Sequence, residues 1–472
     1  MRANLITSLI LGSTVTLSGC TYIKNKFDLF TQKIPEIVIA EVFPPVFPIT
    51  TPSAKANHKY RLVSVGETIQ LDGGMSVNRQ AGSLSYQWRS QNLPANSQAQ
   101  FTTPNNSATD FSIDKAGRYD LQLQVTDNNG ASDYFDLTFS TEASDLPSTS
   151  FIAIGDAGTG GPLQFQVAEG IKRLCEEVGC DFVVGTGDNF YPTGVEKISD
   201  KQFESKFEEP YKNVPLPFYM TLGNHDTNSF IRAGDGIYNP LGDIQLAYAR
   251  DRNKPSFRFQ MPARYYNIST PVESPDKQPL VDIYALDTTL LTSPKDVINR
   301  YKLHRMYQRE GDWLKYKKSI SKAQWQITLG HHTYISNGKH GNAGSYDNAD
   351  EYKFTGALDN EVMKRITGDY VKQFTEEHIC EDSDLYIAGH DHNLQYLKPH
   401  TNCGKTEFIV TGAGARTKQL KDANRNPAYW QADDLPGFFH INIVANQITI
   451  AAYTMTDGSG TAVERFSRTL RK

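Results

Sequence analysis

The sequence predicts an α/β domain preceded by a small all-β sandwich domain, and three observations support this fold class. From about residue 146 to the C-terminus, short apolar segments alternate with stretches of helical period, as in domains built on a mostly parallel sheet. Between about residues 58 and 145, apolar and polar residues alternate one by one, which is the period of strands that bury one face. Before residue 58 the composition is irregular and rich in proline.

The overall composition is that of an ordinary globular protein. The chain has 472 residues, of which 39% are hydrophobic and 21% are charged, and a chain of this length forms roughly two to four domains. The formal net charge of −5 gives no reason to expect a polyanionic partner, and no basic cluster predicts contact with nucleic acid. A phosphate-containing substrate would therefore need another source of positive charge.

Residues 1–19 are typical of a signal peptide that is removed during export. Arg2 supplies a positive charge, an apolar stretch follows from residue 5 to residue 15, and the sequence LSGC ends at Cys20. This pattern resembles a bacterial lipoprotein signal, in which the cysteine is lipidated and becomes the new N-terminus. We therefore expect an exported membrane lipoprotein, anchored through Cys20 on the periplasmic or cell-surface face. The alternative is an ordinary secretory signal with a cysteine there by chance.

The segment after the signal, residues 20–57, contains five prolines and is expected to form a semi-extended tether. The cysteines beyond Cys20 are even in number, which favours disulfide bonds in an exported chain. Their proximity in sequence predicts the pairs Cys175–Cys180 and Cys380–Cys403. Four buried thiols are the alternative.

Residues 58–145 are predicted to form a β-sandwich of immunoglobulin-like type. The sequence GRYDLQLQVTDNNGASDYFDLTFS contains two alternating strands around a DNNG turn, with Tyr119, Leu121, Leu123 and Val125 on one face. The segment resembles a PKD-type repeat through YQW, which contains Trp88, and through the spacing of its apolar residues. A spacer is the plain interpretation of this domain, and binding of a glycan or protein partner is the alternative.

Residues 146–472 carry the chemistry of the chain. Five predicted strands in this part end in glycine followed by polar residues: SFIAIGD, CDFVVGTGD, PFYMTLGNHD, WQITLGHH and SDLYIAGHDH. Glycine permits a sharp turn at a strand end, and ligand sites of α/β sheets lie at such ends. The side chains expected to converge there are Asp156, Asp188, Tyr191, Asn224, His225, His331, His340, His390 and His392.

This mixture of carboxylate and imidazole donors suits first-row transition metals, and it exceeds what one ion needs. Two ions that share one carboxylate would use the whole set. Such a site would also supply positive charge for phosphate chemistry, by binding the attacking and leaving oxygens at phosphorus. Each motif alone has a simpler explanation, such as a turn carboxylate or an exposed loop histidine. The five motifs together, in this order in one domain, indicate a metal site.

The order GD, GDNFY, GNHD, GH and GHDH resembles the calcineurin-like metallophosphoesterases. The tyrosine of GDNFY narrows the resemblance to the purple acid phosphatases, and GDNFYPTGV, LDT (Leu286–Thr288), GHDHNLQYL and GAGAR are similar to the small, tartrate-resistant type. The resemblance runs from about residue 151 to the C-terminus. It implies a β-sandwich flanked by helices, in the layer order αββα.

The resemblance also implies a ligand set, carried over position by position. The first metal of the family, ferric iron, would bind Asp156, Asp188, Tyr191 and His392. The second, a divalent ion (iron, zinc or manganese), would bind Asp188, Asn224, His331 and His390, with Asp188 as the bridge. His225 and His340 would orient the phosphate and protonate the leaving group from outside the ligand set. Asn189 and Asp226 would orient the ligands.

Two positions depart from the family pattern. The family's usual tryptophan in the first motif is Ala157 here, which should leave that side of the site more open. His331 is followed by His332 and Thr333, where the family has a residue other than histidine and then proline. Of the two histidines, we choose His331 as the ligand, because it directly follows the glycine and because His340 then lies at the family's spacing.

The function that the resemblance implies is that of an acid phosphatase, which hydrolyses phosphate monoesters outside the cytoplasm by attack of a metal-bound hydroxide. A phosphodiesterase or nucleotidase on the same scaffold is the alternative among enzymes. An interpretation from another class is a surface binding protein with a vestigial metal site. The complete set of ligand residues argues against it.

Overall fold

The structure is a computed structural model that describes residues 51–227, 241–271, 278–292, 303–346, 360–456 and 460–472. The expected signal peptide and Cys20 lie outside these residues, so the lipid anchor stays a prediction. Within the described ranges, no helix has both the length and the apolar character needed to cross a membrane.

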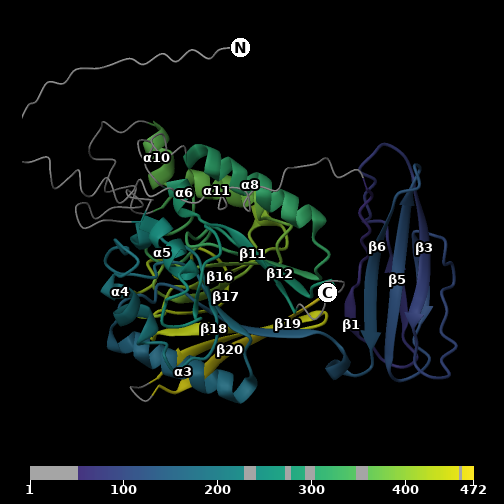
Figure 1. The fold of residues 1–472 in the computed structure, drawn as a ribbon, viewed down its shortest axis with the longest axis horizontal. Helices are drawn as coiled ribbons and strands as arrows, with labels where there is room; N and C mark the ends of the chain where they lie inside the picture. The colour runs from purple at the N-terminus through teal and green to yellow at the C-terminus, as the bar shows by residue number, and fades with distance from the viewer. Residues whose placement is uncertain (1–50, 228–240, 272–277, 293–302, 347–359, 457–459) are drawn as a thin grey trace, which may run out of the picture. The chain divides into compact units, whose positions relative to one another are not determined.

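The predicted all-β sandwich is formed by the strands between Tyr60 and Ser140 (Figure 1). One sheet has the order β1-β6-β5-β3, and β2 pairs with β4 in a second, smaller sheet. The strand bounds are β1 Tyr60–Leu62, β2 Thr68–Asp72, β3 Leu84–Asn92, β4 Ala108–Ser112, β5 Arg118–Asp127 and β6 Ser132–Ser140. Side chains on alternate positions of β5 are buried, as the period of two predicts. Contacts of the sandwich begin at Ser53, within the expected tether.

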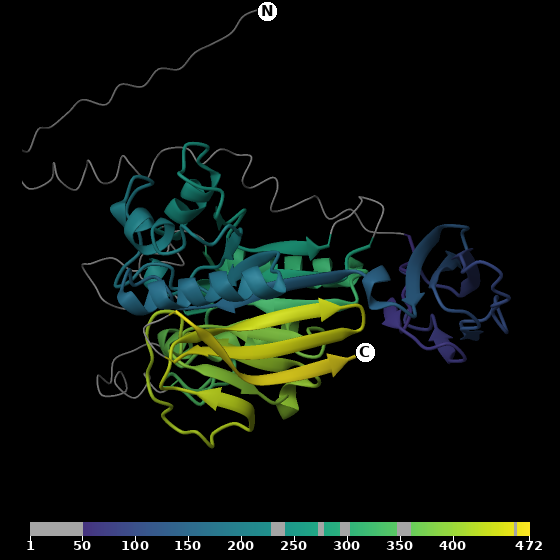
Figure 2. The same ribbon diagram turned by 90° about the horizontal axis from the view of Figure 1, so that it is seen from below.

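Two seven-stranded sheets form the α/β part, and their facing sides share one hydrophobic core (Figures 1 and 2). The first sheet has the order β10-β9-β8-β7-β18-β19-β20. Its strands are β7 Ser148–Ile154, β8 Phe182–Gly185, β9 Phe218–Met220, β10 Phe259–Gln260, β18 Gly437–Val444, β19 Gln447–Met455 and β20 Ala462–Arg471. The second sheet has the order β11-β12-β13-β14-β16-β15-β17. Its strands are β11 Tyr266–Thr270, β12 Val281–Ala285, β13 Trp325–Leu329, β14 Leu385–Ala388, β15 Leu394–Leu397, β16 Glu407–Thr411 and β17 Ala428–Ala432.

Helices cover the outer faces of both sheets, which gives the expected αββα layers. Helix α3 (Pro162–Val178) packs on β19 and β20 of the first sheet. On the second sheet, Leu314 of α8 (Leu303–Ile320) and Phe374 of α11 (Asp369–His378) share a core with Tyr386 of β14. Shorter helices in this part are α4 Lys201–Phe203, α5 Leu241–Arg250, α6 Thr289–Thr292 and α10 Asn360–Ile366.

Parallel pairing brings the motifs to one place. Strands β7, β8 and β9 are parallel neighbours in the first sheet, and β12, β13, β14 and β16 are parallel neighbours in the second. The carboxyl ends of parallel strands meet at the same edge of a sheet. The polar motif of each strand therefore begins at a shared edge.

Both predicted disulfide bonds are present. Cys175 pairs with Cys180 and closes the C-terminal end of α3. Cys380 pairs with Cys403 and ties the chain after α11 to the short helix η4 (Thr401–Cys403). Two cross-links of this kind fit the oxidising compartment expected for an exported chain.

Candidate metal centre

The predicted ligand residues follow directly on the strands, and all of them are buried. Asp156 comes two residues after β7, and Asp188 comes three residues after β8. Asn224 follows β9, while His331 and His390 each come two residues after β13 and β14. Buried carboxylates and imidazoles need partners, because an unpaired buried polar group is costly.

The turns that hold these residues differ in one respect from the sequence-based expectation, which assigned the sharp turn to the glycines. The ligand residues themselves adopt the left-handed backbone region, with φ of 56° at Asp156, 54° at Asp188 and 69° at His390. This conformation costs on the order of 1 kcal/mol or more for such residues and is typical of functional sites. Gly187, before Asp188, is left-handed as well, with φ of 87°, whereas Gly389 provides space, since a Cβ there would lie 2.4 Å from Asp156 Oδ2.

On one side of the site, a phenol lies between two carboxylates. The hydroxyl of Tyr191 is 2.8 Å from Asp156 Oδ1 and 2.7 Å from Asp188 Oδ2. Its single hydrogen can serve only one of the two oxygens at a time. His392 Nε2 is 4.0 Å from Asp156 Oδ1, and the buried Nδ1 of His392 has no hydrogen-bond partner among the described residues. The oxygen and nitrogen atoms of this group therefore offer more lone pairs than there are hydrogens available to bond to them.

The pKa values of two members of this group also indicate a site for a positive ion. Burial, and then the charge of Asp188, raise the pKa of Asp156 well above its usual value. Burial and the two carboxylates likewise raise the pKa of Tyr191. A positive ion between these oxygens would reverse both shifts, because it favours the ionised form of each group.

Asp188 lies between the two halves of the site. Its Oδ2 accepts from Tyr191, while its Oδ1 accepts from the backbone N–H of His225 at 2.8 Å and lies 3.6 Å from His331 Nε2. Burial alone would raise its pKa, but the charges of His331 and His225 lower the pKa of Asp188 to about 2. Asp188 is therefore the carboxylate whose two oxygens face the two groups of predicted ligands.

On the other side, an amide oxygen and two imidazole nitrogens converge. Asn224 Oδ1 is 2.9 Å from His331 Nε2 and 3.1 Å from His390 Nδ1, and the two nitrogens are 3.0 Å apart. His331 Nδ1 lies 2.9 Å from the carbonyl oxygen of Thr186, which only accepts, so the ring hydrogen of neutral His331 is on Nδ1. Its Nε2 then presents a lone pair to the other two atoms. At most one hydrogen, that of His390, is available among the three.

Metal ions placed among these atoms would accept their unshared electron pairs. Asp156, Asp188 and His331 offer ligand atoms that lie within 4.8 Å of one another. The remaining donors extend this cluster on both sides of Asp188, and their chemistry is that of sites for first-row transition metals. The residues present therefore fit a pair of metal ions.

His332, which was the alternative ligand to His331, makes its hydrogen bonds outside the group of predicted ligand atoms. Its Nδ1 is 2.9 Å from Thr288 Oγ1, and its Nε2 is 3.3 Å from Thr292 Oγ1. The same Thr288 hydroxyl accepts the backbone N–H groups of His331 and His332. Thr288, the last residue of the LDT motif, thus holds the turn that aims His331 at the other ligands.

Alanine substitutions at these two positions are expected to separate their roles. The His331→Ala variant should lose one metal ion per chain, because Nε2 is one of three converging donors. The His332→Ala variant should keep its metal and lose about 1–3 kcal/mol of stability, because two buried threonine hydroxyls lose their partner. Elemental analysis and thermal unfolding of both variants measure this. Loss of metal from the His332 variant alone would show that the ligand assignment is wrong.

The two predicted acid–base residues border a cavity of about 130 Å³ beside the ligands, which His225, His340 and Lys339 line together with ligand residues. His225 Nδ1 lies 2.7 Å from the carbonyl oxygen of Pro192, so Nδ1 carries a hydrogen and Nε2 is left for other contacts. The His340 ring packs against that of His390 at a tilt of 33°, with 3.9 Å between centroids. Neither histidine belongs to the group of converging ligand atoms.

Asp391 was not singled out in the sequence, although it is the middle residue of GHDH. Its Oδ1 accepts from the backbone N–H of His340 at 2.9 Å, and its Oδ2 accepts from Ser336 Oγ at 2.5 Å. It thereby fixes the loop that carries His340. Asp226 has the role expected of it, since it accepts from the N–H groups of Gly223 and Asn189 and joins two ligand loops.

Arg416, Lys339 and Lys418 were also not singled out. The guanidinium of Arg416 lies 4.0 Å above the centre of the Tyr191 ring. Lys418 lines the same cavity as Lys339. Arg416 ends the GAGAR motif, but no local pattern marks the two lysines.

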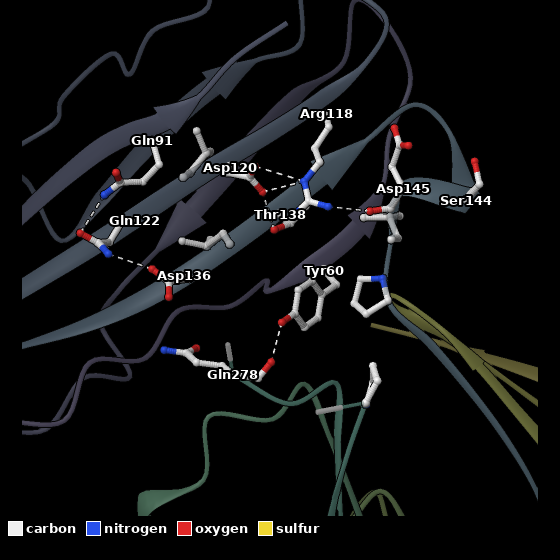
Figure 3. Close-up of a pocket in the computed structure, with 15 residues that line it drawn as sticks. Tyr60, Gln91, Arg118, Asp120, Gln122, Asp136, Thr138, Ser144, Asp145 and Gln278 are labelled. Carbon is white, nitrogen blue, oxygen red and sulfur yellow. Dashed lines mark hydrogen bonds and ion pairs between the residues drawn. The ribbon is translucent and has the colours of Figure 1, made fainter. Parts of the chain in front are cut away.

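A larger pocket, of about 680 Å³, has a separate lining (Figure 3). Most of its lining comes from the all-β sandwich, and its polar side chains bind one another: Gln122 contacts both Gln91 and Asp136, and Arg118 contacts Asp120. None of the predicted site residues lines it. Because the predicted site residues line the smaller cavity instead, we place the active site there.

Comparison with known proteins gives two family matches. Residues 149–394 match the family described as calcineurin-like phosphoesterase. Residues 57–139 match a family described as a PKD domain. These two segments correspond to the α/β part and to the all-β sandwich.

Sequence similarity to acid phosphatases extends over most of the α/β part. The chain is 28% identical over 327 residues to tartrate-resistant acid phosphatase type 5 of Mus musculus, which covers 64% of this chain and 86% of that protein. It is also 28% identical over 342 residues to purple acid phosphatase 7 of Arabidopsis thaliana, and this match covers 69% of this chain and 87% of that protein. A solved structure titled "GAP50 the anchor in the inner membrane complex of Plasmodium" aligns with a TM-score of 0.51 and 18% identity, over 69% of this chain and 89% of that one. At that identity the similarity concerns the fold alone.

Proposed function

The chain belongs to the calcineurin-like phosphoesterase family, and from this premise we propose that it is a two-metal phosphatase that hydrolyses phosphate monoesters. Metal-dependent hydrolysis of phosphoesters follows from the family and from the acid phosphatases among its relatives. The proposal of two metal ions is supported by the unshared electron pairs that converge on both sides of Asp188.

We assign two ligand groups to the metal ions. The first comprises Asp156, Asp188, Tyr191 and His392, and the second comprises Asp188, Asn224, His331 and His390. Two ions held there supply the positive charge that activates water and stabilises the oxygens of a phosphoryl group during displacement. The net charge of the chain is negative, so this source of positive charge is needed for a dianionic substrate.

His225 and His340 act on the substrate from outside the ligand groups. Because Pro192 holds the Nδ1 hydrogen of His225, protonated Nε2 can donate to a phosphate oxygen. His340 lines the same cavity, and the backbone contact with Asp391 fixes its position. In this proposal His340 gives its proton to the oxygen of the departing alcohol, which lowers the barrier most for poor leaving groups.

We further propose that the first ion is ferric iron bound by the Tyr191 phenolate, with divalent iron, zinc or manganese as the second ion. A phenolate bound to ferric iron gives a broad visible absorption band. The oxidised protein is therefore expected to be purple, and Tyr191→Phe should remove the band while the fold, measured by circular dichroism, is retained. A wild-type protein that is active, holds two metals and is colourless when oxidised would contradict the iron assignment.

A phosphoester panel tests the proposed function directly. The purified protein should hydrolyse phosphate monoesters at least about tenfold better than the matched diesters, since a monoester leaves more phosphate oxygens free for two ions. Preference for diesters or for nucleotides alone would replace it with the phosphodiesterase or nucleotidase alternative. No hydrolysis of any ester by metal-loaded protein would support the binding-protein alternative.

The location of the enzyme remains a separate proposal. The lipoprotein-like signal supports export and anchoring of the chain through Cys20 to a bacterial membrane. Fractionation of expressing cells tests it: the protein should sediment with membranes, and its appearance in the soluble fraction would contradict the anchor.

A further inference from the structure

Three cationic side chains border the proposed metal site without taking part in it. Lys339 comes from the loop after β13, while Arg416 and Lys418 come from the loop after β16. Lys339 and Lys418 line the cavity together with Asp188, Asn224 and the site histidines. Arg416 lies against the ring of Tyr191. The positive charges thus gather on one border of the cavity.

These charges are not neutralised within the part of the chain that the structure describes. None of the three forms an ion pair there, whereas other cations of the fold do, such as Arg264 with Asp287 and Arg468 with Glu407. Lys339 and Lys418 line the same small cavity, so their ammonium groups share it. The cations therefore repel one another, which costs free energy unless an anion binds between them.

The backbone holds the two loops in place. The N–H of Lys418 donates to the carbonyl oxygen of His392 at 2.7 Å, which ties this loop to the ligand loop. On the other loop, Gly338 donates its N–H to Ser336 Oγ at 2.9 Å, and its carbonyl oxygen accepts from Arg425 at 2.9 Å. Lys339 and Lys418 themselves are exposed. Flexible ammonium groups on fixed loops suit capture of an anion that enters from solvent.

The charge of a single phosphate does not require all three of these cations. Asp156, Asp188 and the Tyr191 phenolate neutralise three charges of a metal pair that carries about four or five in total. This leaves one or two positive charges, so at most one negative charge of a bound phosphate dianion stays unmatched, which is fewer than the three cations beside the cavity. The additional cationic groups beside the cavity therefore have capacity for a second anionic group on the same substrate.

We propose that Lys339, Arg416 and Lys418 form an anion subsite that binds a second phosphate of the substrate while the first lies at the metal centre. The preferred substrates are then small molecules that carry two phosphate groups, such as sugar bisphosphates. This proposal rests on the proposed phosphatase function and specifies the substrate class of the same site.

A matched pair of sugar phosphates tests the subsite. Wild-type protein is expected to hydrolyse glucose 1,6-bisphosphate with a kcat/KM about tenfold or more above that for glucose 6-phosphate, well beyond the twofold advantage of having two esters. In the double variant Lys339→Gln/Lys418→Gln, this ratio should fall by about tenfold. Arg416 is left intact, because it contacts Tyr191. The bisphosphate preference of the wild type should also weaken with added salt, as ion pairing at exposed lysines does.

The control is Lys172→Gln on α3, which removes the same charge from an ammonium that pairs with Glu176. Its ratio should equal that of the wild type. An unchanged ratio in the double variant, or an equal loss for both sugars, would overturn the subsite. Failure of the wild type to hydrolyse either sugar phosphate, or any other monoester, would count against the proposed function instead.

Discussion

Replacement of Asp188 by asparagine is expected to lower kcat/KM for phosphate monoesters by more than about 10³-fold and to remove both metal ions. The amide keeps the size of the side chain but has no charge and only one oxygen. In the wild type, one oxygen of Asp188 lies beside Tyr191, and the other lies beside His331. An amide cannot place an anionic oxygen on both sides, so neither ion retains its full set of ligands.

Thermal unfolding distinguishes this effect from misfolding. Without metal, Asp188→Asn should still unfold in a single cooperative thermal transition, because the amide keeps the size of the buried side chain. With metal added, the melting temperature should rise for the wild type only, since only the folded wild type binds the ions tightly. The control is Asp181→Asn, at the opposite end of β8, where the carboxylate accepts from Thr149 and Ser150. That variant should retain its activity and metal.

Replacement of His340 by alanine is expected to lower kcat by about 10²–10⁴-fold for esters with poor leaving groups, with two metal ions still bound. The imidazole lines the cavity beside the ligands but is not among the converging donors. An activated ester such as nitrophenyl phosphate needs less protonation of its leaving group, so its hydrolysis should suffer less. A plot of log kcat against the leaving-group pKa should therefore be steeper for the variant.

His400→Ala is a suitable control for the His340 variant. His400 lies at η4, where its ring contacts Tyr334, and it does not line the cavity. This variant should match the wild type with every leaving group. If His340→Ala loses a metal ion, or loses the same factor with every ester, then His340 is not the proton donor.

Most of the site could be predicted from the sequence because its signals are local. Each motif that carries predicted ligands follows a buried apolar strand and begins with a glycine, and parallel pairing of such strands places their carboxyl ends together. The alternating strands of the sandwich were predictable for the same reason, since a period of two is visible in β5 alone.

The rest depends on contacts between distant segments. The preference for His331 over His332 is explained by Thr288, which lies on another strand end and binds the His332 ring. The position of His340 depends on Asp391, and the group of Lys339, Arg416 and Lys418 forms only when two separate loops meet. The left-handed backbone at Asp156, Asp188 and His390 was also not foreseen, because local propensity places it at glycine.

The most direct test of a two-metal phosphatase is the activity of the protein as a function of the metal ions bound per chain. Metal-free protein is titrated with iron and a divalent ion, and bound metal and monoester hydrolysis are measured on the same samples. Activity should be negligible without metal and should rise until two ions are bound per chain. Full activity with no ion or with one ion per chain, or two bound ions without hydrolysis of any monoester, would contradict the proposed function.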